Sequence, residues 1–279
     1  MYKFRSFAAA LATAVGCLAL TAPSAGLAQT TDVAFGQNVA SVTYGPYVRF
    51  ELGGARHELT DAYWLPPGED DPRINFGPIP NDDWRGLGGA AFGYDWQNGF
   101  RADVSLFSTG TIGLTAPCIS VGPTTKSRAC RDHADITDAS IESSGLMGNL
   151  FYAPFEAQGS TAVLQPFVVV GLGFAHNEMG PWTRTANEGN DTGRTVRTFE
   201  GASNTDFAWS VGLGASLQLT RPGEWPVILD AAYRYYDYGS VSGGVDPIED
   251  TGESARQGFT LDHTDQVISI GIRVPLQRY

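Results

Sequence analysis

The stretch Phe207-Ala208-Trp209-Ser210-Val211-Gly212-Leu213-Gly214-Ala215-Ser216-Leu217 decides the fold of this chain. Its odd-numbered positions carry phenylalanine, tryptophan, valine, leucine and alanine, whereas its even-numbered positions carry only alanine, serine and glycine. A period of two points the large apolar side chains to one face of a β-strand and the small or polar ones to the other. An α-helix would need a period of 3.6 residues instead. Residues 207–217 are therefore predicted to form a strand with one apolar face.

The same alternation recurs along the chain and defines eight predicted strands. The seven further segments are residues 48–52, 92–96, 100–106, 150–152, 166–174, 227–235 and 268–274. Short connections (97–99, 156–161 and 220–225) alternate with long ones (56–86, 108–143, 176–206 and 239–264). Such alternation is typical of a transmembrane β-barrel with short periplasmic turns and long outer loops. The predicted fold is all-β, an eight-stranded antiparallel up-and-down transmembrane β-barrel. The alternative is a secreted β-sandwich or lipocalin-like barrel, which would bury its apolar face inside.

Composition excludes several other classes of protein. The chain has 279 residues, 18 basic and 30 acidic side chains and a net charge of −12, and Lys3 and Lys126 are its only lysines. A chain this acidic is a poor partner for nucleic acid, because affinity for nucleic acid comes from neutralising phosphates. Aromatic residues make up 11% of the chain, too many for a disordered protein. We therefore expect an ordered protein with no nucleic-acid partner.

The first 28 residues read as a cleaved secretory signal peptide. Lys3 and Arg5 precede an apolar stretch from Phe7 to Leu20, and Gly26-Leu27-Ala28 offers small residues at a cleavage site. Two alternatives are weaker. Proline and glycine break the apolar run too early for a membrane anchor, and Cys17 lacks the leucine expected before a lipoprotein cysteine. The predicted organisation is residues 1–28 as signal peptide, 29–42 as a short periplasmic leader, and 43–279 as the barrel.

Eight charged residues fall on the predicted inner face of the barrel. If the apolar face contacts lipid, the lumen receives four positive and four negative side chains, namely Arg49, Glu51, Asp95, Arg101, Asp103, Asp230, Arg234 and Arg273. An eight-stranded barrel has an interior just wide enough for side chains, and buried charges must be paired. We predict a lumen charge network that closes the barrel. A catalytic or proton-conducting carboxylate set is the alternative, but balanced arginine–carboxylate pairs are usually structural.

Cys118 and Cys130 are the two cysteines that remain after signal cleavage. In an oxidising compartment they are predicted to form one disulfide, which would stabilise the fold by about 3 kcal/mol. A zinc site is disfavoured, because two thiols with only His133 nearby leave the tetrahedral ligand shell incomplete. No metal site and no cofactor are predicted from the sequence.

Most of the acidic residues lie in the four long segments. Runs such as Glu69-Asp70-Asp71 and Asp82-Asp83 offer carboxylate oxygens that suit divalent cations of a lipopolysaccharide layer. The favoured interpretation is a solvated surface whose charges repel one another and keep these segments apart and soluble. The sequence alone leaves both interpretations open.

Several motifs resemble a known family. The stretches are Asn98-Gly99-Phe100-Arg101-Ala102-Asp103, Leu146-Met147-Gly148-Asn149-Leu150-Phe151-Tyr152, Gln165-Pro166-Phe167-Val168-Val169-Val170-Gly171-Leu172-Gly173, Leu229-Asp230-Ala231-Ala232-Tyr233-Arg234-Tyr235-Tyr236 and Gly271-Ile272-Arg273. Over about residues 43–279 the chain resembles the eight-stranded outer-membrane β-barrel superfamily of Gram-negative bacteria, the OmpA-like and opacity-type surface proteins. The resemblance implies an outer-membrane location, insertion by the barrel-assembly machinery, contact with outer-membrane lipid and lipopolysaccharide, and binding of a host or surface ligand through the loops.

One feature departs from the family pattern. Such barrels usually end on a lipid-facing aromatic residue, but Ile268 to Val274 use even positions for their apolar face and the final Tyr279 is odd. This departure concerns the insertion signal rather than the barrel itself.

The expected function is non-catalytic, in envelope integrity or in surface interaction and adhesion through acidic loops. One alternative is a small, porin-like diffusion channel. Another is a lipid-modifying barrel enzyme, in which His263 would act with a neighbouring loop serine. All four histidines of the chain, including His263, are expected in loops or at strand mouths.

Overall fold

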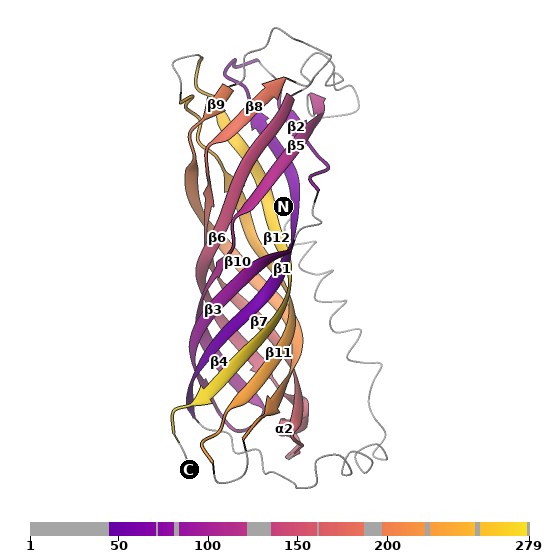
Figure 1. Cartoon of the computed structure of the whole chain (residues 1–279), viewed down its shortest axis with the longest axis vertical. Helices are drawn as coiled ribbons and strands as arrows, with labels where there is room; N and C mark the ends of the chain where they lie inside the picture. The colour runs from indigo at the N-terminus through magenta and orange to yellow at the C-terminus, as the bar shows by residue number, and fades with distance from the viewer. Residues whose placement is uncertain are drawn as a thin grey trace.

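The computed structural model describes residues 45–70, 72–80, 84–121, 135–160, 162–186, 197–220, 224–248 and 252–277. Eight long strands wind around a common axis to form an elongated barrel (Figure 1). They are β1 (Pro46–Leu65), β3 (Trp84–Asp95), β4 (Phe100–Thr109), β6 (Asp135–Tyr152), β7 (Leu164–Met179), β10 (Ala202–Gln218), β11 (Ile228–Ser242) and β12 (Gln257–Pro275). Each predicted strand segment lies within one of these longer strands, to within a residue at its ends, so the predicted strands are confirmed.

Hydrogen bonding closes the eight strands into a ring. Neighbours in the ring are antiparallel and run in the order β1, β3, β4, β6, β7, β10, β11, β12. The last strand pairs with the first, in a register that begins at Tyr47 opposite Pro275 and continues to Thr60 opposite Asp262. Neighbours in the ring are also consecutive among the long strands, which is the up-and-down arrangement. The predicted fold class is confirmed.

Three short connections lie together at one end of the barrel. Between β3 and β4 the backbone turns through Gln97 and Gly99, which both have positive φ (59° and 85°). Asp95 Oδ1 accepts a hydrogen bond from the Gln97 amide at 3.0 Å, and Asn98 Oδ1 accepts one from the Phe100 amide at 3.1 Å. The connection between β6 and β7 carries the four-residue helix α2 (Pro154–Ala157). No helix in the described ranges is long and apolar enough to span a membrane.

A band of apolar side chains faces outward around the half of the barrel nearest the short connections. Leu52 on β1, Phe92 on β3 and Ile270 on β12 are 75%, 60% and 58% exposed. Phe174 on β7 and Phe207 on β10 are similarly exposed near the far edge of this band. Exposed apolar side chains in a continuous ring are unfavourable in water and favourable in lipid. The predicted outward orientation of the apolar face therefore holds for this half.

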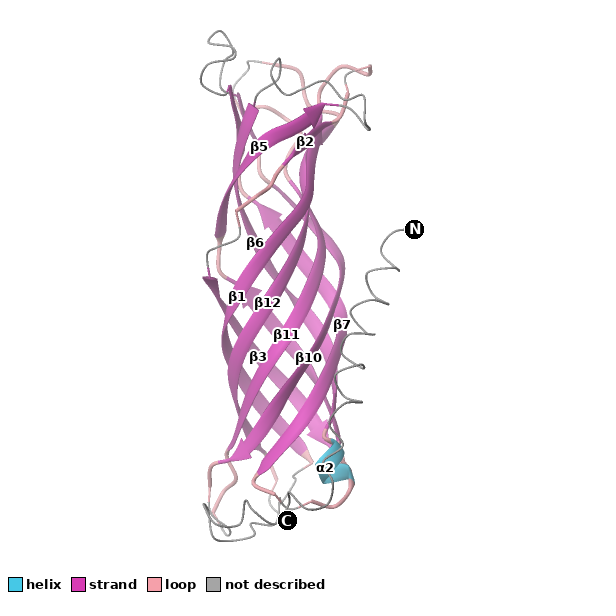
Figure 2. Ribbon diagram, turned by 90° about the vertical axis from the view of Figure 1, so that its right-hand side faces the viewer, coloured by secondary structure: helices cyan, strands magenta, loops and turns pink. Residues whose placement is uncertain are grey.

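The other half of the barrel differs from the sequence-based expectation. The long segments predicted as loops contain large parts of the main strands and four more strands, β2 (Ile74–Phe76), β5 (Ile112–Val121), β8 (Trp182–Ala186) and β9 (Arg197–Phe199). All four lie at the end of the barrel opposite α2 (Figures 1 and 2). A membrane-spanning strand needs about 9–11 residues, whereas β1 has 20 and β12 has 19. We call the part of the barrel beyond the apolar band the outer half.

Polarity inverts between the two halves, which explains the discrepancy. On β1, Phe50 and Leu52 face outward, but beyond them Ala55 and Leu59 are buried while Arg56 and Glu58 are exposed. The outer half therefore has a water-facing surface and an apolar interior, which is formed by Leu59, Ala62, Trp64, Ile74, Phe76, Ile79, Ile112, Leu114, Ala116, Ala139, Ile141, Met179, Trp182, Phe199, Val241, Ala255, Phe259 and Leu261. We call this set the outer apolar core.

Candidate functional site: the barrel lumen

The lumen of the membrane half contains all eight predicted charged residues, which form two linked groups. In the first group, the Arg49 guanidinium donates through Nε to Asp103 Oδ2 at 3.0 Å and also pairs with Glu51. The Asn149 amide donates to the other oxygen of Asp103 at 2.7 Å. Each carboxylate in this group therefore has a cationic partner, as tolerance of buried charge requires.

The second group is centred on Asp230 and Arg273. Arg273 donates to Asp95 at 3.1 Å and to Asp230 at 3.2 Å, and so joins strands β12, β3 and β11. Arg101 lies 3.6 Å from Asp230, and Ser216 donates to the same carboxylate at 2.6 Å. Within this group, the negative charges of two carboxylates are therefore matched by the positive charges of two guanidiniums.

Arg234 is held by neutral partners. It donates to Ser210 at 2.9 Å and to the Asn149 side-chain oxygen, and Asn149 in turn contacts Asp103. Arg234 is therefore attached to the first group through an amide rather than through a direct ion pair. The structure brings the eight predicted residues together, and their role in closing the lumen remains a prediction.

Two small cavities border this network. A cavity lined by Arg49, Glu51 and Phe107, among others, has a volume of about 10 Å³. A second cavity, beside Asp230 and Arg234, also has a volume of about 10 Å³. Each can hold about one water molecule. These volumes are far below what a small-molecule substrate would occupy.

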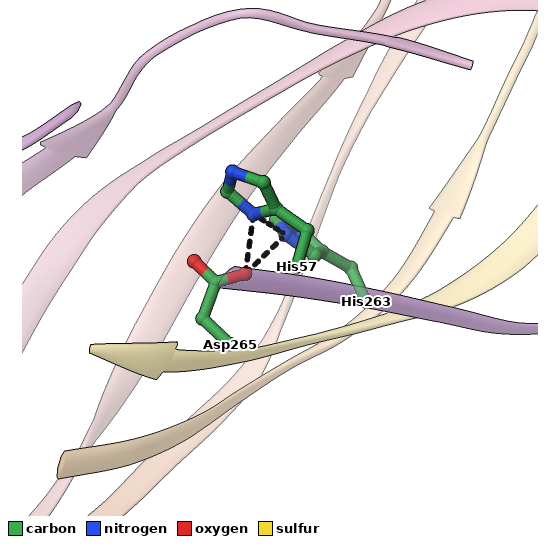
Figure 3. A group of neighbouring side chains, drawn as sticks. All are labelled: His57, His263 and Asp265. Atoms are coloured by element: carbon green, nitrogen blue, oxygen red, sulfur yellow. Dashed lines mark hydrogen bonds and ion pairs between the residues drawn. The ribbon is translucent and has the colours of Figure 1, made fainter. Parts of the chain in front are cut away.

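A second polar layer lies deeper toward the outer half and was missed by sequence reasoning. It includes His57 on β1 and His263 and Asp265 on β12, whose side chains converge in the lumen (Figure 3). The expectation that the histidines lie in loops or at strand mouths is wrong for His57, His176 and His263, which lie within β1, β7 and β12. His133 lies outside the described residues. The available signal was the His263-x-Asp265 spacing, which places both side chains on one face of a strand.

The geometry of this layer is compact and fully buried. His57 Nδ1 lies 2.5 Å from Asp265 Oδ1 and 3.3 Å from His263 Nε2, and His263 Nε2 lies 3.0 Å from Asp265 Oδ1. The exposed fractions of the three residues are 3%, 0% and 0%. The three atoms therefore form a triangle inside the barrel, and we call these residues the His57–His263–Asp265 cluster.

A serine next to the cluster resembles one half of a nucleophile–base pair in composition but not in its hydrogen bonding. Ser143 Oγ lies 3.0 Å from His263 Nδ1 and donates its proton to Asn177 Oδ1 at 2.6 Å. A nucleophilic serine must instead give its proton to the histidine and must meet a substrate. Ser143 and His263 are both completely buried. This arrangement lacks the access that acyl transfer needs.

Other predicted features lie partly outside the described residues. Cys118 lies in β5 and packs against the outer apolar core, but Cys130 is not among the described residues, so their disulfide stays a prediction. Glu69 and Asp70 are exposed next to the end of β1. Asp71, Asp82, Asp83 and Tyr279 lie outside the described residues, as do the signal peptide and leader.

A closed ring of eight antiparallel strands with an outward apolar band defines the class of this protein. It is an eight-stranded antiparallel β-barrel with the outward apolar band of a transmembrane barrel. No family model matches the chain.

Comparison with known proteins finds a similar sequence and several solved structures with some likeness to this chain. The chain is 27% identical over 161 residues to the outer membrane protein PagN of Salmonella typhimurium. That match covers 56% of this chain and 58% of PagN. Among solved structures, the Neisserial surface protein A is 15% identical with a TM-score of 0.40, covering 84% of this chain and 99% of that one. Ail of Yersinia pestis, solved with the heparin analogue sucrose octasulfate, is 11% identical with a TM-score of 0.35, covering 82% and 99%.

Proposed function

We propose that this protein is a non-catalytic surface protein whose outer half mediates surface interaction or adhesion, or contributes to envelope integrity. The observation that carries the proposal is the filled lumen beneath a projecting, β-structured outer half. Paired charges, the His57–His263–Asp265 cluster and the outer apolar core follow one another along the axis. A barrel filled in this way is suited to presenting a surface rather than to passing a solute.

The outer half is a rigid support for the segments it carries. Strand β1 continues for ten residues from Arg56 to Leu65 beyond the apolar band, which corresponds to about 25 Å along a tilted barrel. Glu58 and Asp61 on β1 are exposed, as are Glu69 and Asp70 in the segment that follows β1. We expect the partner to be cationic or to be bridged by divalent cations, because the net charge of the chain is −12.

Adhesion of cells that display the protein tests the proposal. Replacing Glu58, Glu69 and Asp70 with the corresponding amides should reduce attachment to a cationic surface several-fold in low salt, with little effect in high salt. The matched control is Glu224→Gln, which removes one carboxylate at the opposite, periplasmic end. The adhesion form of the proposal is contradicted if the triple variant, the control and cells without the protein attach equally well. The envelope form is contradicted if cells that lack the protein show unchanged sensitivity to detergent.

The channel alternative has its own test. In planar bilayers we expect no stable conductance steps, because the lumen cavities bordering the charge network hold about 10 Å³ each. Stable steps that persist after the outer connections are trimmed would show an open path and overturn the filled-lumen interpretation.

The enzyme alternative is tested on lipid. Incubation with lipid A should leave its acyl-chain masses unchanged, since Ser143 is buried and donates to Asn177. A mass change that is lost in His263→Ala would instead show a lipid-modifying activity.

A further inference from the structure

We propose that the His57–His263–Asp265 cluster is a metal site in the lumen that binds zinc or a similar first-row divalent ion. The inference is independent of the proposed surface function. The donor atoms of the site are His57 Nδ1, His263 Nε2 and a carboxylate oxygen of Asp265, all within 4.8 Å of one another. Two imidazole nitrogens and one carboxylate oxygen form a donor set typical of zinc and related transition metals.

The distances between the donors are near those of a metal-bound set. Ligand atoms about 2.1 Å from a tetrahedral zinc ion are about 3.4 Å from one another. His57 Nδ1 and His263 Nε2 are 3.3 Å apart, and His263 Nε2 is 3.0 Å from Asp265 Oδ1. The third edge, between His57 Nδ1 and Asp265 Oδ1, is shorter at 2.5 Å. Figure 3 shows the two rings and the carboxylate directed toward one point.

A chain of hydrogen bonds fixes which nitrogen of His263 carries a proton. Asn177 donates through Nδ2 to the carbonyls of Tyr238 at 2.9 Å and Ser240 at 3.1 Å, so its Oδ1 faces Ser143. Ser143 gives its only hydroxyl proton to that oxygen. The contact between Ser143 Oγ and His263 Nδ1 then requires a proton on Nδ1. Neutral His263 therefore presents an unprotonated Nε2 to the cluster, as a metal ligand must.

A proton on His57 Nδ1, which lies 3.3 Å away, and a bound cation are the two alternative partners for the lone pair of this nitrogen. Nε2 faces the Asp265 carboxylate, and in neutral His263 no proton lies between them. Asp265 Oδ2 and His57 Nε2 are buried without a hydrogen bond of normal geometry. A bound cation would satisfy Nε2 and the carboxylate together, beside the Tyr238 hydroxyl, which also faces Asp265.

The location indicates a structural rather than a catalytic metal. Leu59 and Leu261 belong to the outer apolar core on one side of the cluster, and Ala55 and Val267 are buried on the other side. His57 pairs in register with Asp265 across the ladder that joins β1 to β12. An ion held there would clamp the closing pair of strands, shielded from solvent by apolar layers above and below.

Metal content of the folded full-length protein provides the test. After loading with Zn²⁺ and dialysis, we expect one ion per chain in the wild type and at least a tenfold lower content in His57→Gln, His263→Gln and Asp265→Asn. The control is His176→Gln, which removes an exposed histidine of β7 and should keep the full content. A wild type that takes up no zinc, or cluster variants that retain it, would overturn the proposal.

A second measurement decides the matter if a cluster variant does not fold. X-ray absorption of the zinc-loaded wild type should show two imidazole nitrogens and at least one oxygen around the metal. A shell without two imidazoles overturns the assignment.

Discussion

At the scale of single residues, Arg273 connects three strands through one side chain, which the alternation of residues in its own strand does not predict. Its guanidinium bonds to Asp95 on β3 and Asp230 on β11, while its backbone belongs to β12. Arginine can serve two carboxylates at once because its donors form a planar fork. The side chain therefore connects strands that are not all neighbours in the barrel.

Arg273→Ala should destabilise the barrel by about 3–5 kcal/mol, because it leaves two buried carboxylates without this cation. Urea unfolding in detergent or lipid, followed by tryptophan fluorescence, measures the change. Arg56→Ala is the control, since Arg56 is exposed beyond the apolar band, and it should cost less than about 1 kcal/mol. A loss for Arg273→Ala no larger than that of the control would show that the network contributes little to stability.

Glycines facing the lumen mark close approach of neighbouring strands. A Cβ placed on Gly173 would lie 2.0 Å from the carbonyl oxygen of Leu146. One placed on Gly148, which is exposed on the outward face of β6, would meet nothing nearer than 3.7 Å. We expect Gly173→Ala to lower the free energy of unfolding by about 1–3 kcal/mol through forced strand displacement. Gly148→Ala should be close to neutral. The same urea titration compares the two, and equal midpoints would contradict the expected crowding.

At the scale of elements, the outer half has a core that depends on side chains of its own. Trp182 on β8 stacks on Phe199 of β9 with ring centroids 4.1 Å apart and 9° between planes. Its indole nitrogen donates to the Gly244 carbonyl at 3.0 Å. The short hairpin of β8 and β9 is thereby attached to the end of β11, and the outer half is more than an extension of lipid-anchored strands.

Trp182→Ala should destabilise the outer half by about 3–5 kcal/mol, because it removes a fully buried aromatic side chain. We expect new protease cleavage near β8 and β9 in membrane-embedded protein, while the membrane half keeps its strands. Trp84→Ala is the matched control, since Trp84 is 53% exposed at the barrel surface. Identical digestion patterns for both variants would contradict a separate outer core.

The strands of the membrane half were predictable because lipid imposes one rule on all of them. Apolar side chains at every second position, as in residues 207–217, locate each strand and its outward face. The outer half escaped prediction because Phe259 and Leu261 use the opposite parity from Ile268 and Ile270 on the same strand. The His57–His263–Asp265 cluster was not predicted either, because His57 and His263 are 206 residues apart and only closure of the ring brings them together.

At the scale of the whole molecule, the ring of strands is continuous across the place where the chain begins and ends. The first and last strands pair as neighbours, and the Leu276 amide donates to the Pro46 carbonyl at 2.8 Å. The ends of the described barrel therefore lie side by side next to the short turns. Any of those turns is topologically equivalent to the native break in the chain.

A circular permutant tests this equivalence. Residues 46–276 joined end to end by a short glycine–serine linker and opened between Gln97 and Gly99 should fold into the same barrel. We expect strand content by circular dichroism and the mobility difference between heated and unheated protein to match the parent. A permutant opened within β7 instead should not fold. Failure of the first permutant to acquire either property would contradict the expectation.

The polarity inversion between the halves has a consequence for how the protein stays in place. To leave the membrane, the outer half would have to draw exposed groups such as Arg56 and Glu58 through hydrocarbon, and a single arginine at the midplane costs about 2–4 kcal/mol. In the other direction, Phe50 and Leu52 would have to enter water. The chain is thus trapped at one depth and in one orientation, and insertion behaves as a one-way step.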